Sequence, residues 1–363
     1  MSLTQIPKGH LREGFTTGTC VTAAAKGALT ALLTTKVPQE VKVHLPIGKV
    51  LNIPIHSYDY DGGSWARCSV IKDAGDDPDV TNGAEVGCEL LMTTGSEVVF
   101  KRGTGVGIVT MPGLEINVGE PAINPVPRQM IRNAITKLKS DHNTDFGVDV
   151  TVFVTRGREL AKKTLNERVG IVDGLSILGT TGIVKPYSSA SYIASIVQGI
   201  DVAVANKIDE LVLNSGGRSE KYLRNLFPGL PEQSFIHYGN WIGDTLQKIQ
   251  KSPIKKVNMG IMLGKAVKLA EHRTVTHSCV AGWNKAFIQR LAHNVGYPES
   301  LTKKIADLNM AGRLTELFDF KPSEPFYQEI LKHGYQTCKS IIPKAKLDIY
   351  LVGREGDIIP YNK

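Results

Sequence analysis

The chain has 363 residues, a formal net charge of +8, 42% hydrophobic residues and 21% charged residues. A chain of this length can form two domains, each with its own core, and this balance is typical of a water-soluble globular protein. It argues against a membrane protein, because no uncharged apolar stretch reaches the about 18 residues that a bilayer requires. The opening residues show no signal-peptide pattern, so we expect a cytoplasmic location.

The cysteines and the basic charge narrow the possible ligands. The 5 cysteines are scattered without a Cys-x-x-Cys pair, so we expect neither a disulfide framework nor a protein-bound metal. A basic chain can bind nucleic acid, but here the basic residues are dispersed and only 7% of the residues are aromatic. We therefore expect no nucleic-acid partner, and an acidic small molecule fits the charge better.

The first predicted element is an alanine-rich helix preceded by Thr-Thr-Gly-Thr at residues 16–19. The helix runs to Leu33, with Lys26 as its only charge. A helix start presents unpaired N–H groups and a partial positive charge, which suit a carboxylate or phosphate. An ordinary N-cap on a buried helix explains the same residues, and the sequence leaves both interpretations open.

Strand-like runs follow this helix. A hairpin is predicted where a Pro-Ile-Gly-Lys turn separates two such runs, and a helix after residue 127 carries its apolar residues on one face. This pattern predicts an α+β domain over residues 1–165. Its expected strands are 41–45, 50–55, 66–71, 97–101, 108–110 and 148–154, and its second helix is 128–139.

Helices and strands alternate beyond residue 187. Alternation of this kind predicts parallel strands joined by helical crossovers. The fold class is therefore α/β, with a Rossmann-like domain over 166–363 and a bridge near 166–186. The expected strands are 210–213, 234–238, 256–262 and 347–352, and the expected helices are 188–206, 219–226, 243–251, 265–270, 281–295, 301–309 and 325–337.

Residues 211–220, Leu-Val-Leu-Asn-Ser-Gly-Gly-Arg-Ser-Glu, predict a strand, a glycine turn and a helix start. Ligands of open α/β sheets bind at the carboxyl ends of the strands, and the next predicted strand runs into Gly239 and Asn240 at the same edge. The full Gly-x-Gly-x-x-Gly pattern is absent, and a tight turn capped by Ser219 explains the residues equally well.

Three further patterns bear on the chemistry. Residues 260–266 imitate a phosphate loop, but the glycine spacing is one residue short and Ala266 replaces the Ser or Thr that would hold magnesium. The run 73–79 contains four aspartates, which suit either a divalent cation or a turn held by Asx hydrogen bonds. His277 is the best titrating candidate of the second half, although a lone histidine is more often structural.

Several short motifs occur in a fixed order over most of residues 11–279. They are LREGFTTGTC at 11–20, KDAGDDPDVT at 72–81, GVG at 105–107, GEPAINPVPR at 119–128, AKKTLN at 161–166, SILGTTGIV at 176–184, GN at 239–240 and THS at 276–278. In these motifs the chain resembles the CbiD family, the cobalt-precorrin-5B C1-methyltransferases of anaerobic cobalamin (vitamin B12) biosynthesis. Their joint order is much more specific than any single motif.

The resemblance implies a function and a fold for the first domain. The function is transfer of a methyl group from S-adenosyl-L-methionine to C1 of cobalt-precorrin-5B, which gives cobalt-precorrin-6A, with the cobalt carried by the tetrapyrrole substrate. The first domain is expected to resemble the ribosomal-protein and GHMP-kinase type. A GHMP-type small-molecule kinase or another phosphometabolite enzyme is the alternative, and an RNA-binding module would need a basic stripe that is not found.

The motifs and the local patterns together give the expected site residues. We expect Asp73 or His277 to act as a weak base. The tetrapyrrole carboxylates are assigned to helix starts, hydroxyls and arginines, and the methyl donor to the loops that follow two strands. The expected substrate-binding residues are Arg12, Thr16, Thr17, Gly18, Thr19 and Arg128, and the expected cofactor-binding residues are Ser215, Gly216, Gly217, Arg218, Ser219, Gly239 and Asn240.

Overall fold

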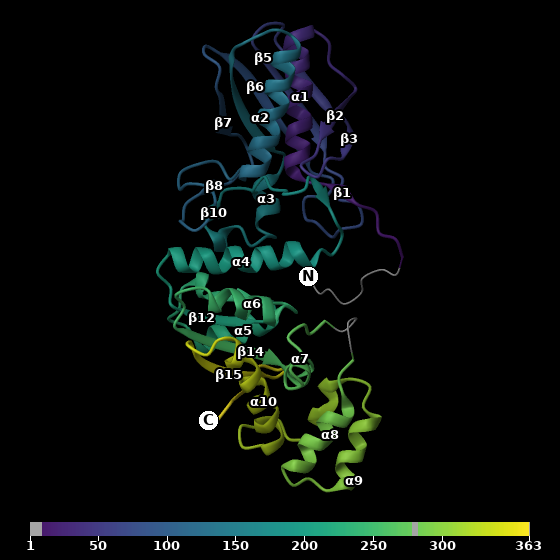
Figure 1. Ribbon diagram of the computed structural model, residues 1–363, viewed down its shortest axis with the longest axis vertical. Helices are drawn as coiled ribbons and strands as arrows, with labels where there is room; N and C mark the ends of the chain where they lie inside the picture. Colours follow the sequence, from purple (N-terminus) through teal and green to yellow (C-terminus); the bar gives the residue numbers. More distant parts are fainter. Residues whose placement is uncertain (1–8, 278–281, 363) are drawn as a thin grey trace. The chain divides into compact units, whose positions relative to one another are not determined.

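The computed structural model describes residues 9–277 and 282–362, and the chain divides into two compact units, Met1–Ser189 and Ala190–Lys363 (Figure 1). The boundary lies later than the predicted one at residue 165. The segment 166–186, which was expected to be a bridge, belongs to the first unit because its strands pair there. Strand β10 (Ile171–Val172) pairs with β8 (Ile108–Val109), and β11 (Ile183–Val184) pairs with β1 (Gly14–Phe15).

The first unit is built on a five-stranded sheet of order β4-β5-β6-β9-β7. Strands β7 and β9 are parallel, and the other neighbours are antiparallel. Helices α1 and α2 lie side by side (Figure 1), and their apolar residues share one core with alternate strand residues such as Val86, Cys88 and Leu90. The elements are α1 (Thr17–Thr34), β2 (Glu40–His44), β3 (Val50–Pro54), β4 (Ser57–Tyr60), β5 (Trp65–Ile71), β6 (Glu85–Thr93), β7 (Val98–Arg102), α2 (Pro125–Asp141), β9 (Gly147–Val154), α3 (Gly157–Ala161) and η1 (Glu167–Val169).

Helix α1 confirms the predicted alanine-rich helix. Its alanines are buried, which lets the helix pack closely on the sheet. The side chain of Thr16 caps the helix by accepting a hydrogen bond from the Thr19 N–H at 3.2 Å. The helix ends at Thr34 and is capped by Thr35, whose backbone is left-handed and whose N–H donates to the Ala31 carbonyl.

The second unit confirms the predicted alternation. Its five-stranded sheet has the order β13-β12-β14-β15-β16, in which the first four strands are parallel and β16 is antiparallel to β15. Crossover helices connect the parallel strands, as such pairing requires. The elements are α4 (Ser189–Ala205), β12 (Glu210–Asn214), α5 (Gly217–Leu226), η2 (Glu232–Ser234), β13 (Phe235–His237), α6 (Ile242–Gln250), β14 (Lys256–Met262), α7 (Leu263–Leu269), α8 (Lys285–Asn294), α9 (Glu299–Thr302), η3 (Lys303–Asp307), η4 (Ala311–Glu316), α10 (Pro325–Ile341), β15 (Lys346–Val352) and β16 (Ile358–Pro360).

Apolar side chains cover both faces of this second sheet. Leu211 and Leu213 belong to a large core shared with α4, α6, α7 and α10. Val212, between them, belongs to a smaller core with Leu223 of α5 and Phe235. The order of the strands reverses at β12, because its successors β13 and β14 lie on opposite sides of it. Open α/β sheets bind ligands at such a reversal, at the carboxyl ends of the strands.

Six strands were not predicted from the sequence: β4, β6 and β16, and the two-residue strands β1, β10 and β11. Strand β6 is central in the first sheet, but Gly87 interrupts its pattern. Glycine is needed there, since a Cβ atom would lie 2.3 Å from the Cys68 carbonyl oxygen on the neighbouring strand. None of the helices in the described part of the chain combines the length and apolar character of a membrane span.

Candidate functional site

The carboxyl ends of β12 and β13 lie next to each other in the second unit. Asn214 is paired in register with His237, and the Tyr238 N–H donates to the Asn214 carbonyl at 2.9 Å. The loops that follow these strands contain the predicted cofactor-binding residues 215–219 and 239–240. The parallel pairing therefore brings the two predicted segments to one edge, as expected.

The glycine turn after β12 is held by its own polar groups. The Asn214 Oδ1 atom accepts from the Gly216 N–H at 3.1 Å. The buried Ser219 hydroxyl donates to the Gly216 carbonyl at 2.9 Å and accepts from the Ser215 N–H at 3.1 Å. Gly216 has φ +149°, which favours glycine, and Cβ atoms built on Gly216 or Gly217 meet no described atom within 4 Å. The turn is therefore rigid, with open space beside its two glycines.

A buried carboxylate ties α5 to the end of β13. Glu220 accepts from Arg224 Nε at 2.8 Å through one oxygen and contacts His237 Nε2 through the other. The Arg224 guanidinium also lies over the Phe235 ring, 4.4 Å from its centroid. These contacts fix the start of α5 relative to the sheet, while Arg218, in the same turn, is exposed.

The second predicted loop also needs its glycine. Gly239 has φ +56°, and a Cβ atom there would lie 2.6 Å from the Tyr192 ring. The Asn240 carbonyl accepts from the Thr276 N–H at 3.0 Å, so the chain brings the half-buried His277 to this part of the unit. A role for His277 as a base stays a prediction, and the Ser278 of its motif lies outside the described residues.

Lys265 is a residue of this edge that the sequence did not single out. It follows β14, donates to the Gly239 carbonyl and lies 5.5 Å from the centroid of the Tyr238 ring. Burial, and then the neighbouring Lys268, lower the pKa of Lys265 to about 8. The glycines and lysine of the imperfect phosphate loop were the available signal, because they lie where β14, the strand beside β12, gives way to α7.

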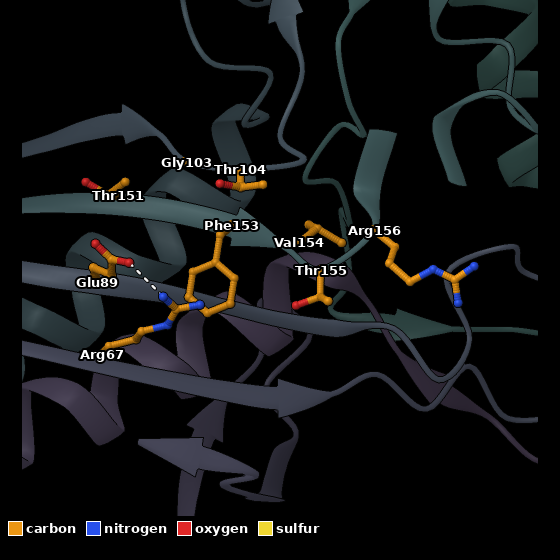
Figure 2. Close-up of a pocket in the computed structure, with 9 residues that line it drawn as sticks. All are labelled: Arg67, Glu89, Gly103, Thr104, Thr151, Phe153, Val154, Thr155 and Arg156. Carbon is orange, nitrogen blue, oxygen red and sulfur yellow. Dashed lines mark hydrogen bonds and ion pairs between the residues drawn. The ribbon is translucent and has the colours of Figure 1, made fainter. Parts of the chain in front are cut away.

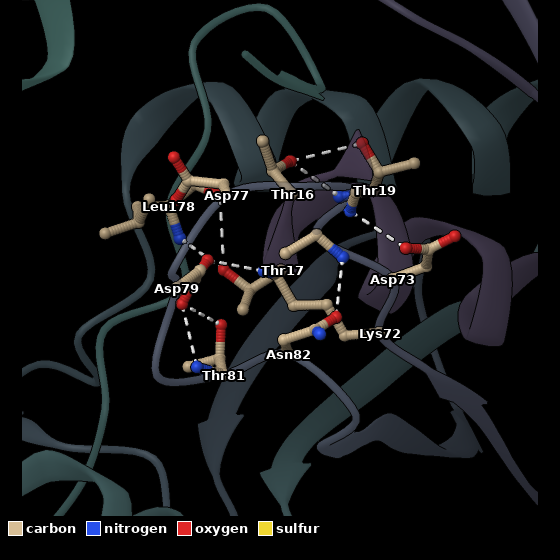
Figure 3. Close-up of polar contacts among 12 residues, drawn as sticks. Thr16, Thr17, Thr19, Lys72, Asp73, Asp77, Asp79, Thr81, Asn82 and Leu178 are labelled. Atoms are coloured by element: carbon tan, nitrogen blue, oxygen red, sulfur yellow. Dashed lines mark hydrogen bonds and ion pairs between the residues drawn. The ribbon is translucent and has the colours of Figure 1, made fainter. Parts of the chain in front are cut away.

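The predicted threonines of the first unit contact the loop 178–182 (Figure 3). The Thr17 hydroxyl accepts from the Leu178 N–H at 3.0 Å and donates to its carbonyl at 3.2 Å. The Thr19 hydroxyl donates to the Gly182 carbonyl at 2.8 Å, and the Gly18 N–H donates to the Leu178 carbonyl at 3.1 Å. These groups are buried and partnered within the chain; their predicted role in binding a tetrapyrrole stays a prediction.

The acidic run 73–79 is engaged in internal contacts (Figure 3). The Asp73 carboxylate accepts hydrogen bonds from both terminal nitrogens of Arg12, at 2.5 and 2.8 Å, and this ion pair lowers the Asp73 pKa. Asp79 binds the buried Lys72 ammonium at 2.5 Å. Burial would raise the Asp79 pKa, but Lys72 and Thr81 outweigh it, so the pKa is lowered. The run is organised as a hydrogen-bonded turn, and Asp73 as a weak base stays a prediction.

Arg128 also has partners inside its own unit. Its Nε atom donates to the Ile123 carbonyl at 2.8 Å, and its Nη2 atom lies 2.8 Å from Glu120. Its predicted contact with substrate is untested. Within the described residues, no group of three or more His, Cys, Asp and Glu side chains is arranged to hold a metal ion, while Cys279 lies outside them.

A depression of about 350 Å³ lies on the first sheet, over β5, β6 and β9 (Figure 2). Inside it the Arg67 guanidinium stacks 4.1 Å from the Phe153 ring centroid and lies 3.1 Å from Glu89. The opposite charges of the two side chains therefore neutralise each other. Gly103 and Thr104, which follow β7, also line the depression. We do not assign the ligand site here, because its Arg67 and Glu89 are already paired with each other.

Comparisons with known proteins agree with the motif pattern. The family model described as CbiD matches residues 4–186, and the model of the CbiD C-terminal domain matches residues 275–363. A Prosthecochloris aestuarii protein named cobalt-precorrin-5B C(1)-methyltransferase is 43% identical over 97% of this chain and 96% of its own length. One of the same name from Priestia megaterium is 41% identical over 98% of this chain and 97% of its own length.

A crystal structure of a cobalamin biosynthesis protein (cbiD) from Archaeoglobus fulgidus is 31% identical and covers 69% of this chain and 77% of its own, with a TM-score of 0.40. The fold of the present chain is mixed α/β, and the glycine turn after β12 lies where such sheets bind ligands. Given the family models and the extent of the matches, the chain belongs to the CbiD family.

Proposed function

We propose that this protein is a methyltransferase that moves a methyl group from S-adenosyl-L-methionine to C1 of cobalt-precorrin-5B, giving cobalt-precorrin-6A. The observation that carries the proposal is the match over nearly the full length to proteins named for this activity. The cobalt belongs to the substrate. The net charge of +8 agrees with a substrate that carries several carboxylates.

The chemistry requires little covalent help from the protein. The ring carbon attacks the methyl carbon in line, the carbon–sulfur bond breaks, and the sulfur leaves as a neutral thioether. Alignment and exclusion of water supply most of the rate in such a displacement. The rigid turn 215–219 and the adjacent loop at Gly239 suit this task, because both are fixed by internal hydrogen bonds or close contacts.

We infer that the second unit is Rossmann-like and binds the methyl donor. The support is its run of four parallel strands, with the order reversed beside the glycine turn after β12. We infer that the first unit is of the ribosomal-protein and GHMP-kinase type, on the basis of two helices against a mostly antiparallel sheet. Its Arg12, Thr16–Thr19 and Arg128 remain our candidates for contact with the tetrapyrrole.

Titration calorimetry tests the donor assignment. The protein should bind S-adenosylhomocysteine, the demethylated donor, and should not bind ATP with magnesium. Magnesium-dependent ATP binding without a response to S-adenosylhomocysteine would favour the kinase alternative. The full activity is tested by incubating the protein with the donor and cobalt-precorrin-5B without oxygen; mass spectrometry should show that the tetrapyrrole has gained one methyl group.

A further inference from the structure

Two donor groups at the carboxyl edge of the second sheet are incompletely partnered within the described residues: the Lys265 ammonium lacks a carboxylate, and the Asn214 side-chain amide lacks a hydrogen-bond acceptor. The Lys265 ammonium donates to the Gly239 carbonyl, and no carboxylate among the described residues lies within ion-pair distance of it. Elsewhere in this unit Lys248, Lys255 and Lys256 each bind a carboxylate, at 2.5, 3.0 and 2.8 Å. A cation that is mostly buried without a counter-ion is costly unless another anion compensates it.

Asn214 provides the second group. Its side chain is fully buried, and its Nδ2 atom has no hydrogen-bond partner among the described residues. Its Oδ1 atom is used by the Gly216 N–H. The backbone of Tyr238 bonds to Asn214, and the Tyr238 ring lies beneath the Lys265 ammonium. One tyrosine therefore links an unsatisfied amide donor to an uncompensated ammonium.

The surroundings give a ligand access to this edge. The space beside Gly216 and Gly217 contains no described atom within 4 Å of a built Cβ position. Lys265 lies in the first turn of α7, which begins directly after β14, the strand beside β12 at the reversal of strand order. Its charge therefore lies at the point in the sheet where we place the methyl donor.

We propose that Lys265 binds the carboxylate of the amino-acid part of the methyl donor, and that Asn214 is a neighbouring donor at the same site. This rests on the proposed function. A carboxylate supplies the charge that the ammonium lacks and accepts hydrogen bonds from both groups. The acetate and propionate groups of the tetrapyrrole have the same chemistry, so the experiment must separate the two sources.

Two ligands and one substitution make the test. S-adenosylhomocysteine carries the carboxylate, whereas 5′-methylthioadenosine has the same adenosyl thioether without it. In calorimetry, Lys265→Met should weaken the binding of S-adenosylhomocysteine by roughly ten- to a hundredfold, the range for one charge-assisted hydrogen bond. The affinity for 5′-methylthioadenosine should not change. Lys251→Met, at an exposed lysine, is the control for loss of a charge and should alter neither affinity.

The outcomes separate this inference from the proposed function. An equal loss for both ligands would mean that Lys265 only supports the Gly239 loop, and unchanged affinities would mean that it does not meet the donor; each overturns the inference alone. Binding of cobalt-precorrin-5B is measured in parallel, as the change in its absorption spectrum when protein is added. If Lys265→Met weakens only this binding, the carboxylate belongs to the tetrapyrrole and the inference is wrong. Failure of the unaltered protein to bind either adenosyl ligand would overturn the donor assignment itself.

Discussion

Gly179 and Thr16 approach each other so closely that a methyl group on the glycine would lie 2.3 Å from the threonine hydroxyl oxygen. Thr16 cannot retreat easily, because the same oxygen caps α1 by accepting from the Thr19 N–H. The backbone of Gly179 has φ +136°. The loop 178–182 therefore closes over the start of α1 only because residue 179 has no side chain.

Gly179→Ala should destabilise the first unit. The added methyl group combines a steric clash with an unfavourable backbone conformation, so we expect a loss of about 2–4 kcal/mol in the free energy of unfolding. Gly48→Ala is the matched control, since Gly48 also has positive φ, +79°, but no described atom lies within 4 Å of its built Cβ. The control should cost about 1 kcal/mol. Equal losses in urea denaturation would contradict the close-contact argument.

Thr17→Val removes a hydroxyl that both accepts from and donates to the Leu178 backbone. Loss of these bonds in a buried contact should cost roughly 1–3 kcal/mol. Thr22→Val is the matched control, because among the described residues the buried Thr22 hydroxyl bonds only to the Gly18 carbonyl within α1. Thermal melting of the two variants measures the difference.

The same Thr17 variant tests the predicted ligand role. If the helix start binds a tetrapyrrole carboxylate, the affinity for the cobalt-precorrin should fall roughly ten- to a hundredfold, while the affinity for S-adenosylhomocysteine stays the same. A lower melting temperature with unchanged precorrin affinity would show that Thr17 serves only to hold the loop on the helix.

Much of the second unit could be predicted because its local patterns agree with the fold. Strand 256–262 was predicted with the bounds that the structure has, since a mostly apolar run of this length between turn signals is typical of a buried parallel strand. The position of the loops 215–219 and 239–240 at one edge of the sheet followed from the parallel pairing alone. Lys265 was not predicted, because its environment depends on Tyr238 and Gly239, which are distant in sequence.

The first unit was harder to predict because its important contacts are long-range. The pattern at residues 16–19 shows hydroxyls at a helix start, but their partners lie about 160 residues later, at Leu178 and Gly182. The segment 166–186 looked like a bridge because glycines separate its apolar residues. Leu175, Ile177 and Ile183 in fact pack into the first core, and that sets the domain boundary after residue 186.

The stability of the protein should depend on pH through Lys265. Burial, then the charge of Lys268, lower the Lys265 pKa from 10.5 to about 8. The protonated lysine therefore costs stability below pH 8, and the cost disappears as the pH rises toward 10.5, because only the unfolded chain then binds the proton. Relative to Lys265→Met, the unaltered protein should gain about 1.4 kcal/mol for each pH unit between these two pKa values. Urea denaturation of both proteins at several pH values measures the difference between their free energies of unfolding. A difference that does not change with pH would contradict the prediction.

Gly217→Val tests whether the methyl donor binds at the turn after β12. The fold should tolerate the change, because Gly217 has an ordinary backbone conformation and no described atom lies within 4 Å of its built Cβ. The valine would instead occupy the space beside the turn, so the binding of S-adenosylhomocysteine should be abolished while the circular dichroism spectrum stays the same. Gly229→Val has equally open surroundings in the same unit and should leave binding intact. Normal affinity in a folded Gly217→Val protein would mean that the donor binds elsewhere.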